Sequence, residues 1–276
     1  MKLVVFCLSL LFVFSCNDQR TESTSSNEKL TNIQRVHKAE FQQILDSLML
    51  DGSILIYDTS TLTFYSNDFE WSEQGHIPAS TYKIPHTLIG LELGILSDTF
   101  VFRYDGTPRN MSIWEQDLKL KDALQFSCVP CYQSLARMIG VDSMKYYLDK
   151  LNYGSMIFDE ESLDMFWLQG ASIINQFQQI EFLQELYNGE LDVSIRNQKL
   201  VREMLVIQED SIGTLSGKTG WSIDGDQNSG WFVGYLETDQ SIYFFASNIE
   251  PMEDFDIREF PAVRRIAVDL AFKALM

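Results

Sequence analysis

The sequence predicts an α+β protein in which an antiparallel five-stranded sheet is flanked by helices and carries a separate helical lobe. Short runs rich in β-branched and aromatic residues occur near both ends of the chain, within residues 52–65 and 213–247. Between them, from about residue 111 to residue 207, apolar residues recur at helical spacing. Strands from the two ends are therefore expected to share one sheet, with the helical lobe at about residues 85–207.

Each element has its own local signal. Helices are indicated where apolar residues return every three or four positions, as at Ile84, Leu88, Leu91 and Ile95. Strands are indicated by short apolar runs bounded by turn residues. In chain order the expected elements are a helix at 36–48, strands at 52–57 and 62–65, a helix from about residue 80, helices at 129–139 and 174–187, strands at 213–219, 230–236 and 241–247, and a helix at 258–275.

Length and charge limit the possible functions. The chain has 276 residues, of which 45% are hydrophobic, and this is enough for a sizeable core. Its formal net charge is −18. A surface this acidic repels phosphate groups, so we do not expect a nucleic-acid partner.

The N-terminus predicts export. Lys2 precedes an uncharged apolar stretch that is too short to span a bilayer, so residues 1–15 are interpreted as a secretory signal. The stretch ends in Val13-Phe14-Ser15-Cys16, which resembles a bacterial lipoprotein cleavage box with Cys16 as the lipidated residue. Residues 16–35 are polar, as in a flexible tether, and the folded domain is expected at 36–276. We therefore expect a periplasmic protein held at the membrane through Cys16.

Ser80 and Lys83 form the first candidate site. They lie three residues apart at the start of a predicted helix and so share one face of it. A serine nucleophile needs a base within hydrogen-bond reach, and Lys83 is the only nearby candidate. Taken alone, this spacing is common, and an ordinary helix start with a surface lysine explains it equally well.

Three further motifs follow in order, namely Ser127-Cys128-Val129, Tyr153-Gly154-Ser155 and Lys218-Thr219-Gly220. A hydroxyl at Ser127 can relay a proton to a leaving nitrogen, and the Lys218 cation can polarise that hydroxyl. Thr219 can bind a substrate carboxylate. A backbone N–H at the end of the Lys218 strand can join that of Ser80 in an oxyanion hole. The ordered set therefore predicts a serine acyl-transfer site.

From about Gly52 to its C-terminus the chain resembles class D (oxacillinase-type) serine β-lactamases. The matching strings are Pro78-Ala-Ser-Thr-Tyr-Lys-Ile-Pro85, Ile89-Gly-Leu-Glu92, Phe166-Trp167-Leu168 followed by Gly170, Glu181-Phe-Leu183, and Lys218-Thr-Gly-Trp221. The resemblance implies the fold of serine β-lactamases and penicillin-binding transpeptidases. It also implies hydrolysis of the β-lactam amide bond of penicillin-type antibiotics, and so antibiotic resistance.

The resemblance also implies roles for individual residues. Ser80 would be the nucleophile, Lys83 the general base after carboxylation by carbon dioxide, and Ser127 the proton shuttle. Backbone N–H groups of Ser80 and Trp221 would form the oxyanion hole. No metal or other cofactor is implied. The remaining implied residues are Trp167 as hydrogen-bond donor to the carboxylated lysine, Val129 and Leu168 as an apolar cap, Lys218, Thr219, Gly220 and Arg258 around the substrate carboxylate, and Met111 and Trp114 at the pocket rim.

The chain departs from the family pattern at two positions. Ser155 replaces the amide of the family's Tyr-Gly-Asn motif, and Cys128 is an unusual middle residue between Ser127 and Val129. Cys128 and Cys131 lack the further ligands that zinc requires. We expect them to be reduced or at least dispensable, because three-residue spacing on one helix face gives poor disulfide geometry.

Other candidates are expected to be structural. The histidines, His37, His76 and His86, show no metal-binding or catalytic-triad spacing. Arg264 and Arg265 are expected on a solvated helix face.

Two other functions share these motifs. A β-lactam sensor domain would acylate and then stall, but such domains follow several membrane-spanning helices. A penicillin-binding transpeptidase or carboxypeptidase would act on peptidoglycan, but would lack the cap formed by Trp167 and Leu168. Sustained turnover of a chromogenic cephalosporin distinguishes the hydrolase from both.

Overall fold

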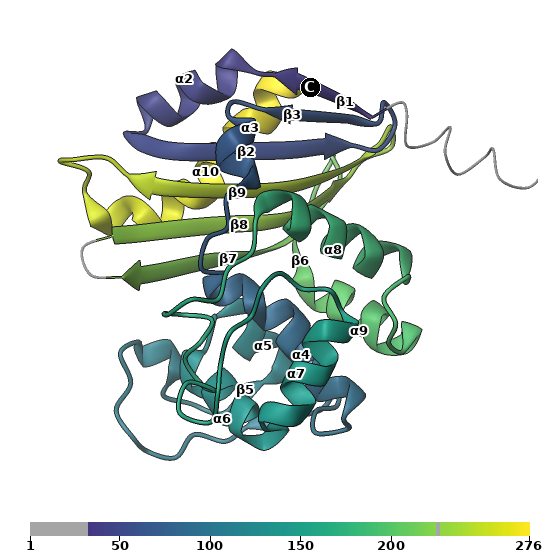
Figure 1. Ribbon diagram of the computed structural model, residues 1–276, viewed down its shortest axis with the longest axis vertical. Helices are drawn as coiled ribbons and strands as arrows, with labels where there is room; N and C mark the ends of the chain where they lie inside the picture. The colour runs from purple at the N-terminus through teal and green to yellow at the C-terminus, as the bar shows by residue number, and fades with distance from the viewer. Residues whose placement is uncertain (1–32, 225–226) are drawn as a thin grey trace, which may run out of the picture. The chain divides into compact units, whose positions relative to one another are not determined.

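The structure, a computed structural model, describes residues 33–224 and 227–276. Residues Gln34–Met276 form one compact unit in which a sheet meets a helical part (Figure 1). The predicted signal at residues 1–15 and the predicted lipidation site, Cys16, lie outside the described residues. None of the described helices is both long enough and apolar enough to cross a membrane.

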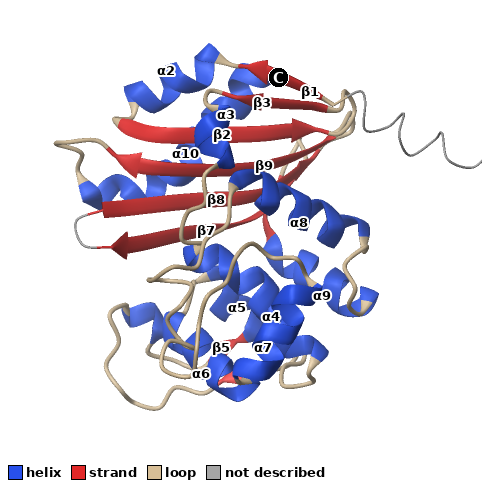
Figure 2. Cartoon of the chain, viewed as in Figure 1, coloured by secondary structure: helices blue, strands red, loops and turns tan. Residues whose placement is uncertain are grey.

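The main sheet contains strands from both ends of the unit, as Figure 2 shows. Neighbouring strands are antiparallel except β1 and β3, which are parallel. A two-stranded sheet of β4 (Val101–Phe102) and β5 (Leu118–Lys119) lies in the helical part. The order across the main sheet is β1 (Gln34–His37), β3 (Thr63–Ser66), β2 (Leu50–Asp58), β9 (Ile242–Pro251), β8 (Gln227–Glu237), β7 (Thr214–Asp224) and β6 (Val206–Glu209).

The predicted α+β architecture is confirmed, but the sheet has seven strands in the described chain and not five. The five expected strands are β2, β3, β7, β8 and β9, and the two additional ones, β1 and β6, form its edges. Each edge strand has four residues, none of them fully buried. An exposed edge strand this short has no run of buried apolar residues, so its sequence carries no strand signal.

Two hydrophobic layers enclose the sheet. Along β2, Ile54 and Ile56 belong to the cluster shared with helices α2 (Ala39–Ser47) and α10 (Phe260–Leu275). Leu55 belongs instead to the larger cluster on the helical side. Because successive side chains of a strand point to opposite faces, a strand covered on both faces is a continuous apolar run.

The helical part surrounds helix α4 (Lys83–Glu92), in which residues 83–91 are all buried. A 3₁₀ turn, η1 (Ala79–Tyr82), leads directly into α4 from the sheet. The other helices are α3 (Phe69–Glu73), η2 (Ser112–Trp114), α5 (Leu120–Gln125), α6 (Val129–Ile139), α7 (Val141–Lys150), α8 (Gln176–Asn188), α9 (Ile195–Leu205) and η3 (Ile257–Glu259).

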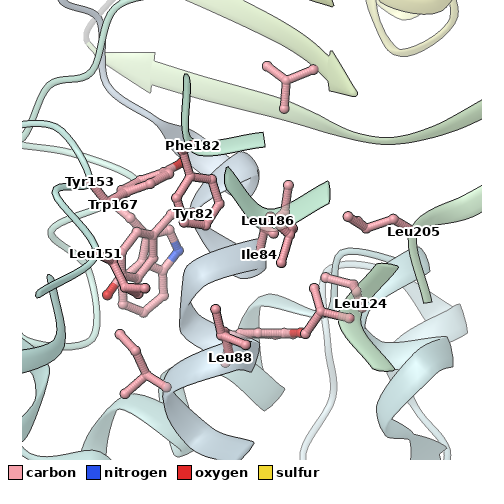
Figure 3. Packing of buried hydrophobic residues seen from close by; sticks show 14 of the residues in the cluster. Tyr82, Ile84, Leu88, Leu124, Leu151, Tyr153, Trp167, Phe182, Leu186 and Leu205 are labelled. Carbon is pink, nitrogen blue, oxygen red and sulfur yellow. The ribbon is translucent and has the colours of Figure 1, made fainter. Parts of the chain in front are cut away.

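Packing around α4 fixes the start of that helix. Figure 3 shows Leu124 and Leu205 lying near Ile84 and Leu88 in the main hydrophobic cluster. On the other side of the helix, the ring of Tyr82 stacks on Trp167 with centroids 5.5 Å apart. Side chains held on both sides leave the turn before α4 little freedom to move.

Candidate active site

Ser80 and Lys83 are brought together by the turn from η1 into α4. Lys83 Nζ donates a hydrogen bond to Ser80 Oγ over 2.8 Å. Residue Ser80 is 7% exposed, so it remains reachable from solvent, whereas Lys83 is fully buried. A hydroxyl in contact with a buried amine is the arrangement that nucleophilic catalysis requires.

Burial changes the protonation of Lys83. Desolvation lowers the pKa of Lys83 from 10.5 to about 7, because the charged amine loses its hydration. The Tyr132 ring, with its centroid 5.2 Å from Lys83 Nζ, lies beside the amine. A substantial fraction of Lys83 is therefore neutral at pH 7, when its amine can accept a proton.

Ser127 and Lys218 form a second hydroxyl–amine pair. Lys218 Nζ on β7 donates to Ser127 Oγ over 2.5 Å and to the carbonyl oxygen of Thr219 over 2.8 Å. Burial, followed by the nearby positive charges of Lys83 and Arg264, holds the pKa of Lys218 well below its usual value. Because β7 carries Lys218 and approaches Ala79, directly before Ser80, at Gly220, the two pairs lie in one region.

The backbone has an uncommon conformation directly before one candidate serine and at the other. Ala79, directly before Ser80, has φ 51°, and Ser127 has φ 54°. Residues with a Cβ rarely occupy this left-handed region, and such conformations concentrate at functional sites. Neither residue is a glycine, so these angles could not be expected from residue type. Both residues lie at motifs that the sequence analysis had selected for other reasons.

Strand β7 passes directly beside η1. A Cβ atom at Gly220 would lie 3.2 Å from the Ala79 Cβ and 3.2 Å from the Pro78 carbonyl oxygen, so glycine permits the close approach. Strand β6 pairs with β7 only between Thr214 and Ser216. Beyond Ser216, β7 has no partner strand on that side in the described chain.

Comparisons with known proteins agree on the family. The profile described as "Penicillin binding protein transpeptidase domain" matches residues 52–261. β-Lactamase OXA-10 from Pseudomonas aeruginosa is 38% identical over 205 residues, which cover 73% of this chain and 77% of that protein. The class D β-lactamase YbXI from Nostoc superposes with a TM-score of 0.77 at 38% identity, over 83% of this chain and 97% of that structure. FUS-1 (OXA-85), a class D β-lactamase from Fusobacterium nucleatum subsp. polymorphum, gives 0.81 at 33% identity, over 87% and 98%.

The chain belongs to the class D β-lactamases. The resemblance stated from the sequence motifs is thereby confirmed. Members of this family are hydrolases that open the β-lactam ring and so confer antibiotic resistance, and this enzyme is one of them. In residues 33–224 and 227–276 no three His, Cys, Asp or Glu side chains are grouped so that they could hold a metal ion.

Trp167 lies in the aromatic cluster beside the lysine of this β-lactamase. Its ring centroid is 5.4 Å from that of His86, and His86 in turn contacts Tyr132 at 5.3 Å. The indole Nε1–H of Trp167 is buried without a hydrogen-bond partner in the described chain. Both ring nitrogens of His86 are also buried and unpartnered there. An unpaired buried donor is costly, so the Trp167 indole N–H is free to donate to a water or to a group bound beside it.

Two arginines of this enzyme were assigned from the sequence, Arg258 to the substrate carboxylate and Arg264 to solvent. Arg258, predicted to hold the substrate carboxylate, binds Asp256 over 2.6 Å, and its side chain is 85% exposed. Arg264, expected in solvent, is buried and donates to the Gly220 carbonyl oxygen, so that prediction was wrong. Because Arg264 follows Phe260 by four residues and precedes Ala267 by three, helical spacing could have placed it on the buried face of α10.

The remaining predicted residues of this β-lactamase have mixed positions. Val129 begins α6, and Leu168 packs partly buried against the main cluster. Trp114 donates its indole N–H to the Phe126 carbonyl oxygen over 2.9 Å, and Met111 is 49% exposed. The roles of these four residues at the site stay predictions.

Two departures from the family pattern have structural outcomes. Ser155 exchanges two backbone hydrogen bonds with Ile173, while Gly154 adopts φ 60°. Cys128 and Cys131 form a disulfide with their Cα atoms 5.4 Å apart, so the expectation of reduced cysteines was wrong. Cys128 precedes α6 as its N-cap, with non-helical angles, and this position brings the two sulfurs within bonding distance.

Proposed function

We propose that this enzyme hydrolyses the β-lactam amide bond through an acyl-enzyme on Ser80. Ser80 Oγ attacks the β-lactam carbonyl carbon while the base at Lys83 takes the hydroxyl proton. The observation that carries this assignment is the fully buried amine of Lys83, 2.8 Å from Ser80 Oγ, with its pKa lowered to about 7. A lysine at its ordinary pKa would be protonated and unable to act as a base.

Departure of the ring nitrogen requires a proton. We assign its delivery to the Ser127 hydroxyl, which accepts a hydrogen bond from Lys218. Burial and two neighbouring cations weaken the hold of Lys218 on its proton, so the pair can pass one on. The same cation, with Thr219 and Arg258, is proposed to bind the substrate carboxylate. Backbone N–H groups of Ser80 and Trp221 would stabilise the oxyanion.

The test of this function is sustained turnover. The enzyme should hydrolyse many equivalents of a chromogenic cephalosporin at a constant rate. A burst of one equivalent of hydrolysis per enzyme, with no further turnover, would instead indicate a β-lactam sensor or a penicillin-binding transpeptidase, since both acylate and then deacylate slowly.

The site also fits a carboxylated Lys83. A carbamate on its amine would supply an anionic base, and the unpartnered indole N–H of Trp167 is a suitable donor to hold such an anion. Carboxylation requires the neutral amine, which the lowered pKa of Lys83 provides. We propose that Trp167 retains this group and that Val129 and Leu168 shield it.

We expect carbon-13 bicarbonate to give a carbamate signal in the wild type and a much weaker one in Trp167→Phe. Trp231→Phe is the matched control, because Trp231 is equally buried but donates its indole N–H to the Ile77 carbonyl oxygen. Without added bicarbonate, hydrolysis should fall as the pH drops below about 7, where Lys83 becomes protonated. Equal signals in wild type and Trp167→Phe would contradict the role given to the indole.

We further propose that residues 1–15 direct export, that Cys16 carries a lipid anchor on a tether over residues 16–35, and that residues 36–276 form the periplasmic catalytic domain. Expressed in a bacterial host, the wild type should partition into detergent, whereas Cys16→Ser should move to the aqueous phase. Cys7→Ser, in the same apolar stretch, is the control and should partition like the wild type. Aqueous partitioning of the wild type would indicate a freely soluble exported form.

A further inference from the structure

The disulfide lies in the polypeptide directly beside the proposed proton shuttle. Cys128 follows Ser127, and its side chain is tied to Cys131 in the first turn of α6. Cys128 is also fixed through its backbone N–H, which donates to the Ala123 carbonyl oxygen over 2.9 Å. Ser127 itself holds a left-handed φ of 54°, which a residue with a Cβ keeps only when its surroundings impose it. The covalent tie is thus one of the restraints that hold the Ser127 hydroxyl against Lys218.

The disulfide can also be reached from solvent. Both cysteines line a cavity of about 420 Å³, together with Phe102, Trp114 and Pro130. Cys128 is only 1% exposed, whereas Cys131 is partly exposed. A small thiol entering this cavity would therefore meet the sulfur of Cys131 first.

The local chemistry favours attack at Cys131. The backbone N–H of Cys131 donates to Cys128 Sγ over 3.3 Å, at the N-terminus of an eleven-residue helix. Both features stabilise negative charge on that sulfur, so Cys128 is the better leaving thiolate. Departure of a stabilised thiolate speeds thiol–disulfide exchange.

We propose that Cys128–Cys131 is a thiol–disulfide exchange site for small thiols, and that its opening slows acylation by releasing Ser127. A thiolate attacks Cys131 Sγ, the bond to Cys128 breaks, and its electron pair leaves Cys128 as a thiolate. The product is a mixed disulfide on Cys131. A second thiolate attacks the outer sulfur, which frees Cys131, and the two thiols leave joined as their own disulfide. The enzyme gains two electrons and each external thiol loses one.

This inference rests on the role proposed for Ser127. Because Ser127 delivers a proton during acylation, reduction should lower the rate of acylation by penicillin about tenfold, as expected when a catalytic group is displaced slightly. Deacylation, which does not expel the ring nitrogen, should change less. Reoxidation should restore the original rate.

The experiment uses the full chain treated with reduced glutathione, which is removed by gel filtration before the kinetic measurement. Alkylation and peptide mass mapping follow Cys128 and Cys131 separately from Cys7 and Cys16. Circular dichroism verifies that the reduced enzyme is folded. The variant Cys131→Ser retains the Cys128 N-cap but cannot form the disulfide. It should therefore acylate at the rate of the reduced enzyme, and glutathione should not change that rate.

A double-mutant cycle separates this inference from the proposed function. In Ser127→Ala, reduction should cause no further loss of acylation rate, because both changes act on one group. If Ser127→Ala acylates normally, the role proposed for Ser127 fails. Suppose that Ser127→Ala acylates slowly, whereas the reduced wild type and Cys131→Ser acylate as fast as the wild type with its disulfide intact. In that case only the present inference fails. Opening of the bond by a protein oxidoreductase but not by glutathione would overturn the assignment of the cavity to small thiols.

Discussion

The variant Ser80→Ala is expected to lose β-lactam hydrolysis down to the uncatalysed background while keeping its fold. The acyl bond needs the Ser80 hydroxyl, and the adjacent Thr81 cannot replace it because its Oγ1 donates to the Pro78 carbonyl oxygen over 2.6 Å. Loss of the hydrogen bond from Lys83 should change the free energy of unfolding by only about 1 kcal/mol. Penicillin absorbance measures the hydrolysis, and thermal unfolding measures the stability.

A second buried serine provides the control for that variant. Ser247 on β9 is fully buried, with a hydroxyl that has no partner in the described chain, so Ser247→Ala removes the same atoms away from the proposed site. It should hydrolyse penicillin at the wild-type rate. When deacylation is blocked, mass spectrometry should find a penicillin adduct on Ser80 in this control and none in Ser80→Ala. A folded Ser80→Ala enzyme with near-normal turnover would refute the assignment of the nucleophile.

Lys83→Met should lower hydrolysis by roughly 10²- to 10⁴-fold, the usual contribution of a positioned base. Methionine keeps the length of the buried side chain but removes the amine that contacts Ser80. Both acylation and deacylation should slow, because each requires a proton to leave a nucleophile. Stopped-flow acylation and steady-state turnover measure the two steps separately.

The same variant should be at least as stable as the wild type. Between pH about 7 and pH 10.5, the unfolded chain binds a proton that the folded Lys83 has lost, so burial of Lys83 destabilises the fold at neutral pH. This penalty fades as the pH rises toward 10.5, and Lys83→Met removes it altogether. Lys145→Met, at an exposed lysine of α7, is the control for charge and should keep full activity. Wild-type rates in Lys83→Met would show that the base lies elsewhere.

Local features of the site were predictable from sequence. A serine and a lysine three residues apart at a helix start necessarily share a face, and α4 keeps them within hydrogen-bond distance. The five interior strands carried apolar runs because the sheet is covered on both faces. The convergence of Ser127 and Lys218 was an expectation from the order of motifs, since nothing local relates positions 91 residues apart.

Other features depend on tertiary context. The left-handed angles at Ala79 and Ser127 have no signature in residue type, because both residues normally avoid them. The disulfide escaped prediction because the two cysteines were treated as residues three apart on one helix face, whereas Cys128 has the non-helical backbone angles of an N-cap. Arg264 was assigned to solvent on its charge alone, although a buried guanidinium is acceptable where carbonyl oxygens accept its hydrogen bonds.

The pairing of strands from both ends of the chain has a consequence for the order of folding. Strand β2 pairs with β9, so Gly52 must come to lie opposite Ile249 before the sheet is complete. Such non-local pairing is slow, whereas the turn from η1 into α4 needs only neighbouring residues. The proposed nucleophile, Ser80, and its proposed base, Lys83, can therefore meet early, as the helical part condenses. The contact between Ser127 and Lys218 forms only when strand β7 packs against the helical part. The polypeptide therefore completes its folding and its proposed catalytic site in the same late step.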